Sequence, residues 1–202
     1  MIIQIDPKII LYGRKIQGLC YKKYHGHSKG CINIGKKRGC PMQHAPQPLI
    51  NEVLDFNKEI FLIYTSFDVG IFAERMRRDH PQWEGKPREW YNPRRWQGTS
   101  RAAHNLEIEK ILRDNNYNEQ IEIVNKSPEA HGVNISELML KATGIELNWT
   151  WPPVHDWQDN NNWKQNKVYQ ASIGGYINKN LDEKLLNNCN NIYNIESQIK
   201  DI

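Results

Sequence analysis

Three of the four cysteines of the chain lie close together near its start. Cys20, Cys31 and Cys40 fall within the segment "GLCYKKYHGHSKGCINIGKKRGCP" (18–41), which also holds two histidines between the first two cysteines. Thiolates and imidazoles are the side chains that bind zinc ions and iron–sulfur clusters in proteins. We therefore take this segment as the candidate metal site of the chain.

The spacing of the three cysteines favours a cluster over a zinc ribbon. Ten residues separate Cys20 from Cys31 and eight separate Cys31 from Cys40, so the C-x2-C pairs of zinc ribbons are absent here. A proline follows a cysteine ligand in some iron–sulfur proteins, as Pro41 follows Cys40. Glycines allow backbone to approach a cluster, and Gly30, Gly35 and Gly39 lie close to Cys31 and Cys40 in the sequence. We predict a [4Fe-4S] cluster bound by the three thiolates.

Three thiolates leave one iron of such a cluster without a cysteine. That position is either open to substrate or filled by another residue, and the candidates are His25, His27, His44 and Cys189. His25 and His27 are also candidate catalytic acid–base groups, because imidazole titrates near neutral pH. Two alternatives remain: a structural Zn²⁺ with three thiolates and one histidine, and three thiols without a metal.

Two stretches resemble an uncharacterised family of predicted metal-binding proteins. "GCINIGKKRGCP" (30–41) is similar to that family's cysteine motif "GC.NYGK…CPP", and "SPEAHGVNISELMLKATGIEL" (127–147) is similar to its C-terminal "PS.EA.GIDV" segment. The resemblance implies a metal, probably an iron–sulfur cluster, with the three cysteines as ligands. It covers about a fifth of the chain and implies no reaction. Two features depart from the family pattern: Met42 follows Pro41, and residues 99–126 hold no second cysteine group.

A second candidate site combines positive charge with aromatic rings. The segment 75–101 holds eight Lys or Arg residues interleaved with Trp and Tyr. Guanidinium groups bind phosphate or carboxylate, and flat rings stack on bases. We predict that this segment binds an anionic small molecule or a nucleic acid, through Arg88, Arg94, Arg95, Trp96 and Arg101. The alternative is that its Arg and Trp side chains pack on one another and cover the core.

The stretch "QGTSR" (97–101) is expected to open a helix, whose exposed N–H groups would add an anion site. Three further residues are weaker candidates. Asp68 follows a predicted buried strand, where α/β proteins place catalytic groups, but it is equally a helix cap. Glu129 and His131 could face a ligand, although Ser127 and Pro128 before them also read as a helix start.

The composition sets the class of protein. The net charge of +4 over 202 residues is modest and does not indicate a protein that coats DNA. The sequence contains no P-loop, G-x-S-x-G or H-E-x-x-H motif. It has neither a signal-peptide pattern at its start nor an apolar run near the roughly 20 residues of a membrane span. We expect a cytoplasmic protein without a membrane partner.

Elements that would position these residues can be read from hydrophobic periodicity. We expect a strand or a pair of strands over 2–14, and further strands over 59–67, 120–124, 146–151 and 167–177. Helices are expected over 48–57 and, capped by Asp68, over 70–80. Two more are expected from about residue 99 to 114, with Ala103, Leu106, Ile111 and Leu112 inward, and over 135–143 between Asn134 and Gly144. The segment 81–98, with its prolines and glycines, is expected to be irregular.

These patterns give an α/β (or α+β) fold. We expect a single domain over 1–180, with a central mixed sheet flanked by helices and an N-terminal cysteine-rich metal-binding loop. An Asn-rich peripheral tail, partly helical, is expected over 181–202. The expected function is metal binding, as an iron–sulfur-dependent enzyme of unknown reaction or a redox protein. The alternative is a structural-zinc module that binds single-stranded nucleic acid or RNA.

Overall fold

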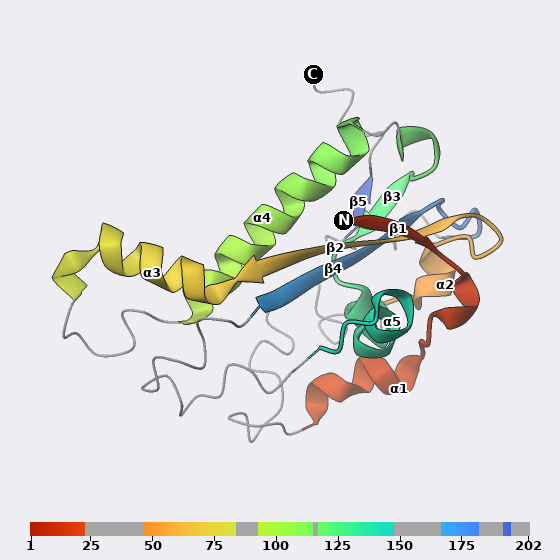
Figure 1. Cartoon of the computed structure of the whole chain (residues 1–202). Coiled ribbons are helices and arrows are strands. Elements are labelled where there is room, and N and C mark those ends of the chain that lie inside the picture. The colour runs from red at the N-terminus through yellow and green to blue at the C-terminus, as the bar shows by residue number, and fades with distance from the viewer. Residues whose placement is uncertain (23–46, 84–92, 115–116, 148–166, 182–191, 195–202) are drawn as a thin grey trace. The chain divides into compact units, whose positions relative to one another are not determined.

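A computed structural model describes residues 1–22, 47–83, 93–114, 117–147, 167–181 and 192–194 (Figure 1). The chain divides into two compact units. Unit 1 comprises Met1–Ile63, Ile111–Asn148 and Ala171–Ile202, and unit 2 comprises Tyr64–Lys110 and Trp149–Gln170. The prediction of one domain followed by a tail stays a prediction, and each unit is described below by itself.

Five described strands form one sheet in the order β1-β2-β4-β3-β5. They are β1 (Ile2–Ile5), β2 (Ile60–Asp68), β3 (Ile123–Asn125), β4 (Lys167–Gly175) and β5 (Ile192–Asn194). The pairs β1/β2, β3/β4 and β3/β5 are antiparallel. At the end of β4, Gly175 lies beside Glu59 and Ile60 at the start of β2, which makes that pair antiparallel too. The fold is therefore α+β, and the expectation of a mixed sheet is wrong because these strands connect without parallel crossovers.

The predicted buried strand is β2. Its first residues, Ile60 to Ile63, are at most 3% exposed, which confirms the prediction from the apolar run. The tight contact with β4 depends on glycine: a Cβ at Gly175 would lie 2.9 Å from the oxygen of Glu59, and one at Gly174 would lie 2.9 Å from Cγ2 of Ile121. The glycine pair of "SIGGY" therefore has a packing role in unit 1.

The helix α3 (Val69–Asp79) begins where the sequence predicts. Asp68 is its N-cap and accepts a hydrogen bond from the backbone nitrogen of Ile71 at 2.9 Å. In unit 2, Val69 and Phe72 are buried together, and Phe67, Met76 and Val168 pack against them. Ile71 is 66% exposed, because the buried stripe of this helix passes through Val69 and Phe72.

The helix α4 (Pro93–Asp114) begins earlier than expected. The segment 81–98 is not irregular throughout, because Pro81–Trp83 forms a 3-10 turn and residues 93–98 belong to α4. Proline is favoured at the first helical position, where its missing N–H costs nothing. The inward stripe is Ser100, His104, Ile108, Ile111 and Leu112, whereas Ala103 is exposed and Leu106 is 66% exposed. Because "QGTSR" lies inside α4, it does not supply the expected helix N-terminus.

The helix α5 (Ile135–Thr143) matches its predicted caps. Asn134 accepts a hydrogen bond from the backbone nitrogen of Glu137 at 3.3 Å, and Gly144 adopts the left-handed conformation with φ 73°. Lys141 and Glu137 add an ion pair at 2.7 Å on the helix surface. Ile135, Leu138 and Met139 are buried and contribute to the core of unit 1.

Short helices complete unit 1. They are α1 (Arg14–Gln17), α2 (Ile50–Val53) and 3-10 turns over Pro7–Ile9, Gly18–Tyr21, Tyr117–Glu119 and Pro128–His131. Figure 1 shows α1, α2 and α5 on the same side of the strands of this unit. The helix expected over 48–57 is thus a single turn with Ile50, Val53 and Leu54 fully buried.

Three expectations about strands and the tail need correction. The first strand ends at Ile5, because Pro7 has no N–H for a sheet and Asp6 caps a 3-10 turn instead. Of the strand expected over 146–151, residues 146–147 are not in a strand, and residues 148–151 lie outside the described residues. Residues 192–194 form β5 rather than a helix, since β3 offers them an edge to pair with.

Among the helices that the structure describes, none has both the length and the apolar character needed to cross a membrane.

Candidate functional site

The predicted metal ligands lie mostly beyond the described residues. The backbone of Cys20 belongs to the turn Gly18–Tyr21, which directly follows α1. Its side chain, the other two thiols Cys31 and Cys40, and the histidines His25, His27 and His44 are outside the described part of the chain, as is Cys189. The ligand set therefore stays a prediction, and the structure describes the residues on either side of the region 23–46.

The described residues on the two sides of the region 23–46 are connected by hydrogen bonds from side chains of α1. Gln17 is 4% exposed, and its Nε2 donates to the backbone oxygen of Gln47 at 2.9 Å. Arg14 donates to the same oxygen at 2.6 Å and forms an ion pair with Glu52 at 3.3 Å. Gln17 precedes the cysteine segment and Gln47 follows it, so the chain leaves and re-enters the described part of unit 1 at one place.

The segment of the second family-like motif lies at that same place. Gln17 Nε2 also donates to the backbone oxygen of Ala130 at 3.0 Å, and the nitrogen of Gly13 donates to the oxygen of Gly132 at 2.9 Å. The nitrogen of Asn134 donates to the oxygen of Leu11 at 2.8 Å. We call the three hydrogen-bonded segments 11–17, 47–49 and 130–134 the clamp. The clamp joins the base of the cysteine segment to the stretch "SPEAHGVN".

His131 lies at the centre of the clamp and is fully buried. Its Nδ1 is 2.8 Å from the backbone oxygen of Pro48. Burial lowers the pKa of its imidazole from 6.5 to about 4, because desolvation disfavours the charged ring more than the bond to Pro48 favours it. The ring is therefore neutral at physiological pH. Its other nitrogen, Nε2, is buried and has no hydrogen-bond partner among the described residues.

Gly132 holds the clamp closed at its narrowest point. Its φ is +79°, a conformation that glycine adopts freely, and a Cβ there would lie 2.7 Å from the oxygen of Gly13 and 2.9 Å from Cδ2 of Leu49. Two segments of the clamp thus approach the backbone of the third so closely that a side chain at position 132 is excluded.

The sequence pointed to only part of this arrangement. The stretch "SPEAHG" was singled out, with His131 as a weak candidate, and Glu129 in the same stretch is exposed. Arg14 and Gln17 were missed, because their partners are backbone oxygens, which every residue carries and no sequence pattern marks. The glycine at position 132 is a signal that could have indicated a close approach of chain segments.

The candidate residues of unit 2 have different surroundings. Asp68 uses its carboxylate to cap α3, and this structural role accounts for its position. The backbone of Arg94, Arg95 and Trp96 lies in the first turn of α4, Arg101 is exposed farther along the same helix, and Arg88 is outside the described residues. On α3, Arg75, Arg77 and Arg78 are exposed, with Arg75 5.6 Å from the centre of the Phe72 ring.

Unit 2 also contains a buried polar group that sequence reasoning missed. His104 and Ser100 are one helical turn apart on α4 and are 4% and 1% exposed. The Oγ1 of Thr65 on β2 is 2.9 Å from Nδ1 of His104, and Gln170 on β4 donates to Oγ of Ser100 at 3.2 Å. The spacing of Ser100 and His104 with Ile108 along one helix was the available signal.

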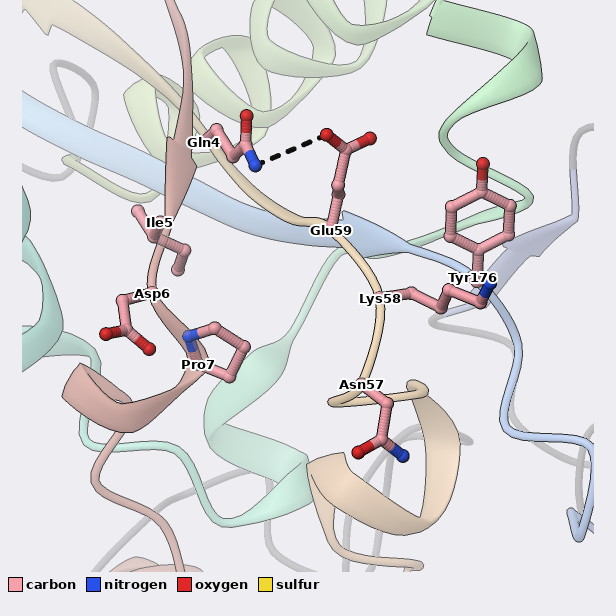
Figure 2. Close-up of a pocket in the computed structure, with 8 residues that line it drawn as sticks. All are labelled: Gln4, Ile5, Asp6, Pro7, Asn57, Lys58, Glu59 and Tyr176. Atoms are coloured by element: carbon pink, nitrogen blue, oxygen red, sulfur yellow. Dashed lines mark hydrogen bonds between the residues drawn. The ribbon is translucent and has the colours of Figure 1, made fainter.

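A surface hollow of about 770 Å³ lies in unit 1, lined by residues of 4–7 and 57–59 and by Tyr176 (Figure 2). Its polar groups bind their neighbours: Gln4 donates to Glu59 at 3.3 Å, Asp6 caps the turn at Lys8, and the hydroxyl of Tyr176 donates to the oxygen of Glu119. Figure 2 shows Asp6 and Glu59 on different segments, with carboxylates that do not converge. This arrangement gives no set of groups that would hold one ligand.

Within the described ranges, no three His, Cys, Asp or Glu side chains are grouped as metal ligands would be. The clamp is the described part of the protein that flanks the predicted metal site in the sequence, since it contains Gln17 and Gln47. Comparison of the chain with protein-family models, curated proteins and solved structures found no match.

Proposed function

We propose that the chain is a metal-binding protein that holds a [4Fe-4S] cluster through Cys20, Cys31 and Cys40. The three thiolates leave one iron without a cysteine, at a position available to a substrate or to another ligand. With that position open, the protein acts as an iron–sulfur enzyme or redox protein on an anionic, phosphorylated or nucleotide-like substrate.

The clamp is the observation that carries this proposal. In the clamp, Gln17, just before the cysteine segment, and Arg14 both donate to the backbone oxygen of Gln47, six residues after Pro41. A loop whose flanking residues are already held together loses less conformational entropy when its ligands gather around a metal. The entropy cost of closing the loop has then already been met when the protein folds. The stretch 127–147, one of the two that resemble the family, also contributes residues to the clamp.

The anionic substrate is proposed from the positive charge of unit 2. The exposed Arg75, Arg77 and Arg78 on α3, together with Arg101 on α4, supply guanidinium groups for phosphate or carboxylate. Arg88, Arg94, Arg95 and Trp96 are the further residues proposed to bind it.

Metal analysis of protein purified without oxygen tests the proposal. The expected protein is brown and contains four iron and four sulfide per chain at full occupancy. Cys20→Ser, Cys31→Ser and Cys40→Ser should each lower iron and sulfide, whereas Cys189→Ser, the matched control, should leave both unchanged. A colourless wild-type protein with one zinc, or with no metal after reconstitution with iron and sulfide, would overturn the cluster.

The second candidate function is a structural-zinc module that binds single-stranded nucleic acid or RNA. It is favoured by the exposed arginines of α3 and by the backbone position of Arg94, Arg95 and Trp96 in one helical turn of α4. It predicts binding that weakens steeply with salt and with Arg94→Ala or Trp96→Ala. Lys167→Ala, at an exposed position of β4, is the control. An absence of binding to single strands at low salt would exclude this function.

A further inference from the structure

In unit 2, the helix α4 is held against two strands by two polar contacts, one helical turn apart. The Oγ1 of Thr65 on β2 is 2.9 Å from Nδ1 of His104, and Nε2 of Gln170 on β4 donates to Oγ of Ser100 at 3.2 Å. Residues one turn apart lie on the same face of a helix, so both contacts are made by one face of α4. The second contact therefore helps to fix the imidazole of His104 beside Thr65.

The members of this polar group differ in how far they are buried. His104 is 4% exposed and Ser100 is 1% exposed, so bulk water does not compete for either side chain. Thr65 is only half-buried, and Ser66, the next residue of β2, is exposed. A buried imidazole thus contacts a hydroxyl group on a residue that reaches the surface, whereas the hydroxyl of Ser100 is enclosed.

The contact between Thr65 and His104 has the geometry of a nucleophile and its base. In enzymes such a pair lies about 2.6–3.2 Å apart, and the base takes the proton of the hydroxyl during attack. A hydroxyl can donate a hydrogen bond, and a neutral imidazole accepts one at the nitrogen that carries no proton. With its proton on Nε2, His104 accepts at Nδ1 and increases the nucleophilicity of Thr65 Oγ1.

We propose that Thr65 and His104 form a nucleophile–base pair that hydrolyses activated carboxylic esters. This activity goes beyond the proposed function, requires no metal and uses residues of unit 2 alone. Thr65 Oγ1 forms a bond to the carbonyl carbon of the ester, and its proton passes to Nδ1 of His104. The bond from that carbon to the leaving oxygen breaks, and His104 gives the proton to this oxygen, which departs as an alcohol. Water then attacks the threonyl ester in the same way, which releases the carboxylic acid and restores Thr65.

The chemistry of threonine narrows the class of substrate. The methyl group of Thr65 lies on the same carbon as its hydroxyl and crowds the attacking oxygen. A small acyl group, such as acetyl, should therefore react faster than a branched one. An activated ester is expected because its leaving oxygen departs readily, so that the pair has mainly to deprotonate the nucleophile.

Covalent labelling of the intact wild-type protein tests the proposal without any variant. A fluorophosphonate forms an oxygen–phosphorus bond with an activated hydroxyl group and releases fluoride, while the base takes the proton. The expected result is a phosphonyl group on Thr65, located by mass spectrometry of peptides. The same protein unfolded in urea should carry no label at Thr65, because the contact with His104 is then lost.

Variants of the two residues separate the nucleophile from its base. Thr65→Val retains the shape of the side chain without the hydroxyl and should abolish the label. His104→Asn retains a hydrogen-bonding partner for Thr65 but cannot take its proton, and it should slow labelling at least about 100-fold. Ser66→Ala removes the neighbouring exposed hydroxyl and is the matched control, which should be labelled like the wild type.

Hydrolysis of p-nitrophenyl acetate measures the activity itself. The full chain should release p-nitrophenolate faster than Thr65→Val, and this difference removes the contribution of thiols and amines elsewhere in the chain. Thr65→Ser retains the hydroxyl without the crowding methyl group, so it should hydrolyse the ester at least as fast as the wild type.

Three results would overturn the proposal. They are a folded wild type without a label on Thr65, a label that forms equally fast in His104→Asn, and equal hydrolysis by wild type and Thr65→Val. If His104→Asn fails to fold, Thr65→Ser decides in its place, because a folded Thr65→Ser protein without activity would contradict a nucleophile at this position. A protein that binds neither a cluster nor zinc would overturn the proposed function and leave this proposal standing.

Discussion

The side-chain amide of Gln17 donates to the backbone oxygen of Ala130 at 3.0 Å, across 113 residues of sequence. The same amide nitrogen donates to Gln47, so one buried side chain joins all three segments of the clamp. The clamp thus depends on a residue that carries no charge and belongs to no recognised motif.

Replacement of Gln17 tests the strength of this connection. Gln17→Ala removes the donor to the buried oxygen of Ala130, whereas the oxygen of Gln47 retains its bond from Arg14, and an unsatisfied buried acceptor costs about 1–3 kcal/mol. We expect the free energy of unfolding in urea to fall by about that amount. Lys15→Ala, on the exposed side of the same helix, should change it by less than about 0.5 kcal/mol. Equal stabilities of the two variants would contradict the role of Gln17.

The neutral imidazole of His131 makes the stability of the metal-free protein depend on pH. Its pKa is about 4 in the folded protein and 6.5 in the unfolded chain, so between these values the unfolded chain binds more protons. The contribution of His131 to the free energy of unfolding is therefore fully present above pH 6.5. It decreases as the pH falls toward 4, by on the order of 3 kcal/mol. Urea unfolding across this range should show a steeper decrease for wild type than for His131→Asn. Parallel curves would show that His131 does not titrate in this way.

Gly132 and Gly144 form a matched pair of left-handed glycines. Alanine at either position lowers the free energy of unfolding by about 1 kcal/mol, because a residue with a Cβ is strained in the left-handed conformation. Only at Gly132 would the added Cβ also meet other atoms, 2.7 Å from the oxygen of Gly13. At Gly144 the same Cβ would meet nothing within 4 Å. We expect Gly132→Ala to lower the melting temperature clearly more than Gly144→Ala. A similar decrease in both variants would mean that the clamp adapts to the side chain.

Asp68 is predicted to act through helix capping. Asp68→Ala removes the acceptor for the nitrogen of Ile71 and should cost about 1 kcal/mol of unfolding free energy. Asp68→Asn retains an oxygen acceptor at the same place and should cost much less. Thermal unfolding of the two variants measures the difference. If Asp68→Asn is as unstable as Asp68→Ala, the negative charge rather than the cap is what the helix requires.

Local signals in the sequence predicted local structure well. The caps Asp68, Asn134 and Gly144 lie where expected, because a cap needs only a side chain and the few backbone atoms next to it. The strand over residues 60–68 was equally clear, since a continuous apolar run of that length suits a buried strand.

The position of α4 shows where local signals were insufficient. The prolines at 81, 87 and 93 together predict an irregular segment, yet Pro93 begins a helix of 22 residues. A proline before a helix and a proline in a loop have the same letter, and the surroundings in the fold decide between them. The inward face was also shifted: Leu106 is exposed and the less apolar His104 is buried, because contacts of the fold outweigh side-chain hydropathy at single positions.

The candidate site was predictable only at its two motifs. The cysteines and "SPEAHG" stand out as residue types, whereas their connection requires Gln17, Gln47 and Pro48, of which two contribute only a backbone oxygen here. Such contacts arise from the path of the chain, and a single sequence does not record that path.

The order of the strands has a consequence for the synthesis of the protein. The strand β2 (60–68) lies between β1 and β4, but β4 begins only at Lys167. At about 5–20 residues per second, roughly 5–20 seconds pass between the two strands on a ribosome. Throughout that interval one edge of the apolar strand β2 has no native partner. A nascent chain of this protein is therefore expected to require chaperone protection until its last third has been made.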